Sequence, residues 1–174
     1  SLILTSVGQA QVLGIPEEKC VYLHGYSNVQ DRLVSQRPDL SKSLALELAL
    51  TSAIDRAGIS AADIAYRDIY SCFPMVVHLA AEVLGLNPGK DEMTVTGGLP
   101  FFGGSGNNYS THAIASMVDK LRQDPEAYGL ILANGGYVSK QSAGIYSARA
   151  LSTWTDHSSN DLQQAIDAQP QYKL

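Results

Sequence analysis

The feature that most constrains the fold is an amphipathic helix pattern flanked by two strand patterns. The segment SKSLALELALTSAIDRAG (41–58) has Ser41 or Ser43 as a candidate N-cap and ends at Gly58. Its apolar residues recur at spacings of three and four: Leu46, Leu50, Ala53, Ile54 and Ala57. Segments rich in β-branched and aromatic residues flank it at 20–27 and 66–70. This strand–helix–strand order predicts parallel strands joined by a covering helix.

The rest of the chain continues the alternation. A strand pattern at 2–5 and a short helix pattern precede the first flanking strand, and 92–98 reads as an extended segment. Helix patterns follow at 74–84 and 107–122, and two adjacent strand patterns, YGLILANGG and GYVSKQSAGIYSA, come after them. We predict an α/β fold with a mixed, mostly parallel five-stranded sheet, helices on both faces and an antiparallel last pair. Residues 1–150 would form one domain, and 151–174 a C-terminal extension with a short helix at about 160–168.

Composition excludes several classes of protein. The 174 residues carry a net charge of −5 and scattered basic residues, so we expect no nucleic-acid partner. No apolar run is long enough to span a bilayer, so we expect no membrane partner. Two cysteines, Cys20 and Cys72, are too few for a disulfide framework and favour a cytoplasmic protein. The chain starts without methionine inside an apparent strand, which indicates a domain excised from a longer protein.

The stretch TVTGGLPFFGGSGNNYSTHA (94–113) concentrates glycine just before a helix pattern. It lacks the lysine of a P-loop and the spacing of a dinucleotide fingerprint, so neither nucleotide site is predicted. A glycine-rich turn that ends at a helix N-terminus remains, with Asn107 or Asn108 as the cap. Such a terminus can stabilise an oxyanion or a carbonyl oxygen, or it can serve only as a tight turn.

The segment DIYSCFP (68–74) places polar side chains at the end of a strand, where α/β folds bind ligands. Cys72 precedes a helix and could be an activated nucleophile, but a buried packing role is favoured because no base is evident. Tyr70 and Ser71 could donate hydrogen bonds. The four histidines, His24, His78, His112 and His157, have no zinc spacing with the cysteines, so we predict no metal site.

Three segments in this order, DIYSCFP, TVTGGLPFFGGSGNNYSTHAIASMVDKLR and YGLILANGGYVSKQSAGIYS, resemble the C-terminal half of the thiolase superfamily. The resemblance is strongest to thiolase-like proteins and to sterol-carrier-protein-type thiolases, often called acetyl-CoA acetyltransferases. It covers nearly the whole chain and implies a βαβαβαββ half-fold. It also implies a CoA thioester as substrate, no separate cofactor, and an N-terminal half as the missing partner.

The resemblance assigns roles to particular residues. Tyr70 stands where the family has an asparagine or histidine that holds the thioester oxygen. Gly104 stands where the family has its catalytic histidine, and Ala133 where it has its acid/base cysteine. The substrate-binding residues implied are Ser71, Cys72, Phe73, Gly97, Gly98, Gly103, Gly104, Asn107, Asn108, Asn134 and Gly135. The catalytic candidates left are Tyr70 and, more weakly, His112.

These replacements leave several functions open. Claisen chemistry needs a thiolate and groups that transfer protons, and neither glycine nor alanine can transfer one. The first expectation is one domain of a thiolase-like acyl-CoA acetyltransferase with altered chemistry. The alternatives are a non-catalytic acyl-CoA-binding or scaffold domain, and a CoA-thioester aldolase subunit that a partner completes. We expect the isolated chain to be inactive in thiolysis and, because a half-fold exposes apolar surface, to form homo-oligomers.

Overall fold

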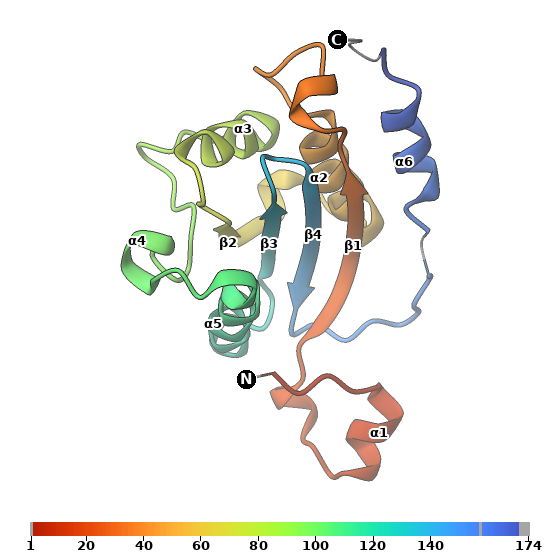
Figure 1. Cartoon of the computed structure of the whole chain (residues 1–174). Helices are drawn as coiled ribbons and strands as arrows, with labels where there is room; N and C mark the ends of the chain where they lie inside the picture. Colours follow the sequence, from red (N-terminus) through yellow and green to blue (C-terminus); the bar gives the residue numbers. More distant parts are fainter. Residues whose placement is uncertain (1, 157, 171–174) are drawn as a thin grey trace.

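The protein is described from a computed structural model that covers residues 2–156 and 158–170. Its centre is a mixed sheet of four strands, β1 (Tyr22–Gln30), β2 (Ile64–Ile69), β3 (Tyr128–Gly135) and β4 (Lys140–Ser147), in the spatial order β1-β4-β3-β2. β2 and β3 pair parallel, whereas β4 pairs antiparallel with both β3 and β1. Three strands therefore run in one direction and β4 runs against them (Figure 1). The predicted α/β class and antiparallel last pair are confirmed.

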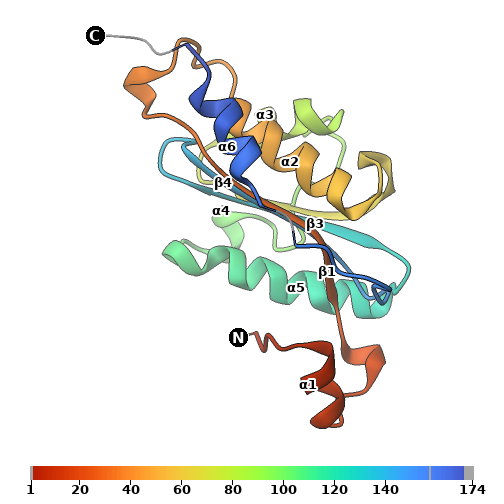
Figure 2. The same cartoon turned by 90° about the vertical axis from the view of Figure 1, so that its right-hand side faces the viewer.

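Helices cover both faces of the sheet (Figure 2). α2 (Leu44–Ala57) and α3 (Pro74–Leu84) lie on one face, and α5 (Tyr109–Gln123) lies on the other. Three shorter helices complete the described chain: α1 (Val7–Val12), α4 (Leu99–Phe102) and α6 (Asn160–Asp167). Single 3-10 turns occur at Glu17–Lys19, Val34–Gln36, Ala61–Asp63 and Gly106–Asn108.

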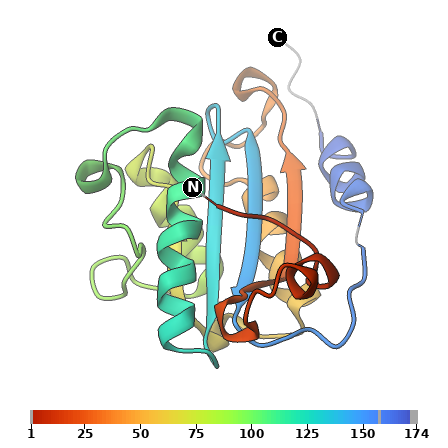
Figure 3. The same cartoon turned by 90° about the horizontal axis from the view of Figure 1, so that it is seen from below.

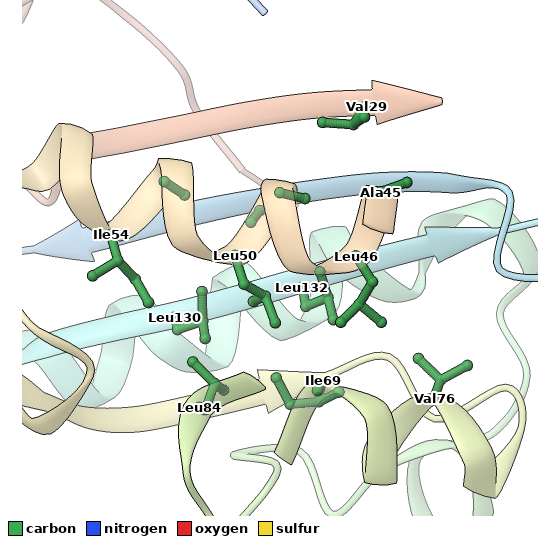
Figure 4. Packing of buried hydrophobic residues seen from close by; sticks show 14 of the residues in the cluster. Val29, Ala45, Leu46, Leu50, Ile54, Ile69, Val76, Leu84, Leu130 and Leu132 are labelled. Atoms are coloured by element: carbon green, nitrogen blue, oxygen red, sulfur yellow. The ribbon is translucent and has the colours of Figure 1, made fainter. Parts of the chain in front are cut away.

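α2 has the capping that its sequence predicts. The Ser43 hydroxyl accepts a hydrogen bond from the Leu46 amide at 3.2 Å, and Gly58 closes the helix in the left-handed conformation at φ 69°. The helix packs closely on β1, because any side chain at Gly25 would overlap the carbonyl oxygen of Ala53. Its apolar face then meets β3 and α3 in a core that includes Leu46, Leu50, Ile54, Leu84, Leu130 and Leu132 (Figure 4).

A second, smaller core lies under α5. Tyr109, Ala113, Met117 and Leu121 on the helix pack against Ile131 of β3. Gly129 allows this approach, since a side chain there would overlap Met117. The two cores hold β3 between them, so the end of β3 is a fixed platform for the site described below.

The expectation of five strands is wrong. The segment 2–5, read as the first strand, forms no strand, and its Ile3 and Leu4 side chains are 89% and 99% exposed. Its apolar residues therefore contribute to neither core. On the other side of the sheet, the segment after Met93 runs beside β2, where the Ile69 amide donates to the Met93 carbonyl at 2.9 Å. The segment 92–98, predicted to be extended, forms no strand of the sheet and bends at 95–96.

The C-terminal segment lies along the outer edge of β1 (Figure 3). α6 buries Ile166 in the core shared with α2, close to the predicted bounds of 160–168. Residues 171–174 of the predicted extension, and His157, lie outside the described residues. Nowhere in the described part of the chain is there a helix of the length and hydrophobicity needed to traverse a bilayer.

Candidate functional site

A hollow of about 470 Å³ opens where β2 and β3 end and α5 begins. Tyr70, just after β2, forms one wall with Gly106 and Asn107 from the 3-10 turn before α5 and with Ser110 from the first turn of α5. Ala133, Asn134 and Gly135 at the end of β3 form the floor. The ends of parallel strands meet at one edge of a sheet, which brings these segments together although they are far apart in sequence.

Tyr70 is held from two sides. Its amide donates to the Leu132 carbonyl at 3.0 Å, which continues the pairing of β2 with β3. Its ring packs edge-to-face on Tyr109 with a centroid distance of 5.2 Å. Tyr70 lines the hollow, and its hydroxyl has no hydrogen-bond partner among the described residues. This hydroxyl is therefore free to bind a ligand oxygen.

A buried carboxylate supports this wall. Asp68 is 1% exposed and accepts hydrogen bonds from the amides of Val95 and Thr96, each at 3.1 Å. It also accepts from the Thr96 hydroxyl at 2.8 Å and from the Tyr109 hydroxyl at 3.0 Å. Four donors satisfy the charge, which a buried carboxylate requires. Asp68 thereby joins the end of β2, the glycine-rich segment and the first turn of α5.

Tyr109 takes part in this network as a neutral phenol. Burial, with the adjacent charge of Asp68, raises its pKa to about 12, although the Thr96 hydroxyl, 2.7 Å from the phenol oxygen, acts in the opposite direction. At neutral pH its hydroxyl keeps its proton and donates a hydrogen bond to Asp68. Tyr109 is therefore a support for Tyr70 rather than a proton-transfer group.

The glycine-rich segment makes a sharp turn that another residue type could not easily adopt. Gly98 has φ 79° and ψ 175°, and a side chain there would lie 3.0 Å from the Ser71 hydroxyl. That hydroxyl accepts a hydrogen bond from the Leu99 amide at 3.1 Å and fixes the start of α4. Gly97 has φ 86°, and Gly103 and Gly104 lie exposed beyond α4.

His112 lies apart from the hollow. Asn108 occupies the N-cap position just before α5, as predicted, but its side chain makes no capping hydrogen bond; its side-chain amide bonds the His112 Nε2 atom at 2.9 Å instead. The imidazole also packs edge-to-face on Phe102 at 4.9 Å between centroids. Of the two catalytic candidates, only Tyr70 lines the hollow within the described chain.

Cys72 takes part in a hydrogen-bonded chain on the other side of the sheet end. The Asn134 side-chain amide donates to the Cys72 sulfur at 2.9 Å, and Gln141 donates to the Asn134 oxygen at 2.8 Å. Cys72 also packs against the core of α2 and α3. Phe73 is exposed and stacks on Tyr137, so it belongs to the rim of the sheet rather than to the hollow.

The predicted site residues thus separate into groups. Tyr70, Asn107, Asn134 and Gly135 line the hollow. The others support it or lie outside its lining: Ser71, Cys72, Phe73, Gly97, Gly98, Gly103, Gly104, Asn108 and His112. Sequence reasoning missed Asp68, although a charged residue inside a strand pattern is a recognisable signal for a buried hydrogen-bond network. It also missed Lys140 and Ser142, which lie on the outward face of an alternating strand.

The chemistry available in the hollow is limited. Within the described residues, its lining contains no carboxylate, imidazole or thiol. Ala133, the position where the resemblance places an acid/base cysteine, contributes only a methyl group to the floor. No group of three histidine, cysteine, aspartate or glutamate side chains in the described chain is arranged to hold a metal ion. The hollow can hydrogen-bond and orient a ligand, and Tyr70 is its clearest donor.

The fold is that of a known thiolase-like structure. No family model and no curated protein matches the chain. Among solved structures, a monomeric SCP2-thiolase like protein type 1 from Mycobacterium smegmatis matches with a TM-score of 0.91 and 44% sequence identity. The match covers 96% of this chain but only 37% of that protein. The chain therefore has an SCP2-thiolase-like fold and spans little more than a third of its relative's length.

Proposed function

We propose that the chain is one domain of a longer thiolase-like protein and that it binds an acyl-CoA thioester in the hollow beside Tyr70. The observation that carries the proposal is the place of Tyr70 just after β2 in the lining of the hollow, with a hydroxyl that has no hydrogen-bond partner among the described residues. The 44% identity to an SCP2-thiolase-like protein supports the class of ligand. The rest of the longer protein, the N-terminal half by resemblance, would supply the other wall.

The proposed role of Tyr70 is to donate a hydrogen bond to the thioester carbonyl oxygen. A donor fixed in a partly buried site stabilises the negative charge that develops on this oxygen when the adjacent carbon loses a proton or a bond. Leu132 and Tyr109 hold Tyr70 in place, so little reorganisation is needed. Ordinary acetyl transfer also needs proton-transfer groups, which Ala133 and Gly104 do not provide.

The longer protein would therefore catalyse an altered carbon–carbon reaction on the thioester, such as an aldol cleavage completed by a partner, or would bind thioesters without turnover. Ala133 on the floor of the hollow favours the second function, since a methyl group cannot transfer a proton. The free hydroxyl of Tyr70 favours the first. We place the protein in the cytoplasm, where CoA thioesters are available and its two free cysteines stay reduced.

The test is a turnover panel on the longest form of the protein, measuring thiolysis of acetoacetyl-CoA and aldol cleavage of a 3-hydroxyacyl-CoA. We expect thiolysis to be absent and Tyr70→Phe to lower any cleavage at least about tenfold, as loss of a charge-stabilising donor does. His112→Ala is the matched control and should leave the rate unchanged. Thiolysis by the isolated chain, or equal loss in both variants, would contradict the assignment.

A further inference from the structure

The C-terminal segment is bound along the outer edge of β1. Every second residue from His24 in β1 to Arg32 just beyond it hydrogen-bonds one residue of this segment, at distances from 2.6 to 3.2 Å. The partners, in order, are Arg149, Asp156, Ser159, Gln163 and Asp167. Because the residue numbers on both sides rise together, the segment runs parallel to β1, in the place that a fifth strand would take (Figure 3).

The segment does not pair with β1 as a strand. Each of the five bonds has a side chain at one end or at both ends. The Gln163 side chain accepts from the Gln30 amide at 3.0 Å and donates to the Gln30 carbonyl at 2.8 Å. The Ser159 hydroxyl accepts from the Asn28 amide at 3.2 Å. Side chains therefore replace the backbone groups that a neighbouring strand would offer.

Residues 158–167, which we call the strap, have few anchors in the core. Within this described stretch Ile166 is the one buried side chain, and Leu162 packs partly against the same core. Arg56 of α2 adds a hydrogen bond to the Ser158 carbonyl at 2.7 Å. The eight residues of α6 are fewer than the roughly 12–15 that an isolated helix needs in water. Segments with so few buried apolar contacts open at a lower free energy than core strands do.

The strap is also part of the hollow. Gln163 lines the hollow beside Gln30 and Asn28, the two β1 residues whose amides bond strap side chains. The bonds that hold the strap on β1 therefore also hold Gln163 in the hollow. When the strap leaves β1, the hollow loses this wall and the sheet edge is exposed in the same step.

We infer that the strap opens as one unit while the sheet stays folded, and that its opening removes the β1 side of the hollow. In the closed state Gln163 and Gln30 form this wall together. A ligand that contacts Gln163 shifts the strap toward the closed state. The opening does not depend on which ligand the hollow binds, so the proposed function stands or falls separately.

Native-state hydrogen exchange of the unliganded chain tests this opening, because the Asn28 and Gln30 amides are bonded to strap side chains. Relative to intrinsic rates, we expect both amides and those of α6 to exchange at one common rate. This rate should be at least about a hundredfold faster than at Leu130 and Leu132 in β3. Low urea concentrations should accelerate exchange in β3 steeply and in the strap hardly at all, because opening the strap exposes little surface.

A variant tests whether the strap opens as one unit. Ile166→Ala should accelerate exchange at Asn28, Gln30 and α6 by one common factor of at least about tenfold, because the buried anchor of the strap is lost. Gln164→Ala, on the exposed side of α6, is the matched control and should change these rates by no more than about twofold.

Two results would overturn the inference, and the first needs only the unaltered chain. If Asn28 and Gln30 exchange at the rate of β3 and with its urea dependence, the strap does not open apart from the sheet. If these two amides exchange faster than those of α6 and do not respond to Ile166→Ala, each amide opens alone and the strap is not a unit.

Discussion

Asp68 shows how one residue can fix several parts of a site. It is a charged residue inside a buried strand, and its four hydrogen bonds join β2, the glycine-rich segment and α5. Neutralising it keeps the shape but places an amide group among donors, so some bonds are lost. We predict that Asp68→Asn lowers the free energy of unfolding by about 2 kcal/mol.

Urea denaturation measures this loss, with Asp119→Asn on the exposed face of α5 as the matched control. The control should change stability by no more than about 0.5 kcal/mol. Equal stability of the two variants would show that the Asp68 network contributes nothing.

Tyr109 gives a pH prediction whose direction follows from its raised pKa of about 12. In the unfolded chain a tyrosine ionises near its ordinary pKa of about 10, so above that pH the unfolded state loses a proton that the folded state keeps. The contribution of Tyr109 is therefore fully present below pH 10 and is lost as the pH rises toward 12.

Absorbance titration of phenolate formation checks this. The last tyrosine to ionise in the folded protein should be absent from the titration of Tyr109→Phe. Tyr66→Phe is the comparison variant. The pKa of the Tyr66 phenol is also raised, because its hydroxyl hydrogen-bonds Asp124. If Tyr109→Phe instead removes a tyrosine that titrates near pH 10, the buried neutral phenol is contradicted.

The backbone conformation of each glycine in the glycine-rich segment, rather than the sequence, shows which positions require glycine and which tolerate another residue. Gly98 has a positive φ, and a side chain there would lie only 3.0 Å from the Ser71 hydroxyl, whereas Gly104 has open space around it. We predict that Gly98→Ala lowers the free energy of unfolding by about 1–3 kcal/mol and that Gly104→Ala is nearly neutral. Thermal unfolding of the two variants measures this difference. A larger loss of stability in Gly104→Ala than in Gly98→Ala would contradict the prediction.

At the scale of elements, α6 protects an otherwise open sheet edge. Ser159 accepts from the Asn28 amide at 3.2 Å, and Gln163 pairs with the Gln30 backbone as a neighbouring strand would. Open strand edges pair readily with other chains. We predict that removing residues 152–174 makes the chain self-associate more strongly than the full chain does.

Sedimentation velocity over a concentration series measures this association. A second variant, Ser159→Ala with Gln163→Ala, tests the edge pairing without removing the buried Ile166, and Gln164→Ala on the exposed side of α6 is its control. We expect more association in the double variant than in the control. A truncated chain no more associated than the full chain would show that α6 does not protect the edge.

The elements that could be predicted from sequence are those whose local signals agree with their packing. α2 has a periodic apolar face, a serine cap and a closing glycine, and the structure places it within three residues of the prediction. The segment 2–5 had an apolar run and no other signal, and it forms no strand because no described residue pairs with it. Strand pairing depends on distant residues, which a local pattern does not contain.

The residues of the site at the end of β2 and just before α5 were predictable from the sequence, whereas those on β1 and β4 were not. Tyr70 and Asn107 lie at a strand end and a helix start, where α/β folds gather ligand groups, and the structure brings them together. Asn28 and Ser142 approach across more than a hundred residues of sequence, and no local signal links them. His112 is near in sequence to the glycine-rich turn, yet Asn108 and Phe102 hold it outside the hollow.

At the scale of the whole molecule, the fold is thiolase-like, whereas the described residues that line the hollow include no carboxylate, imidazole or thiol for thiolase proton transfer. The central claim is that a CoA thioester binds beside Tyr70. NMR titration of the labelled chain with a non-hydrolysable acyl-CoA analogue measures it most directly. We predict the largest amide shifts at Tyr70, Gly106, Ala133 and Gly135, with weaker binding in Tyr70→Phe. Shifts confined to other parts of the chain, or no shifts at millimolar analogue, would contradict it.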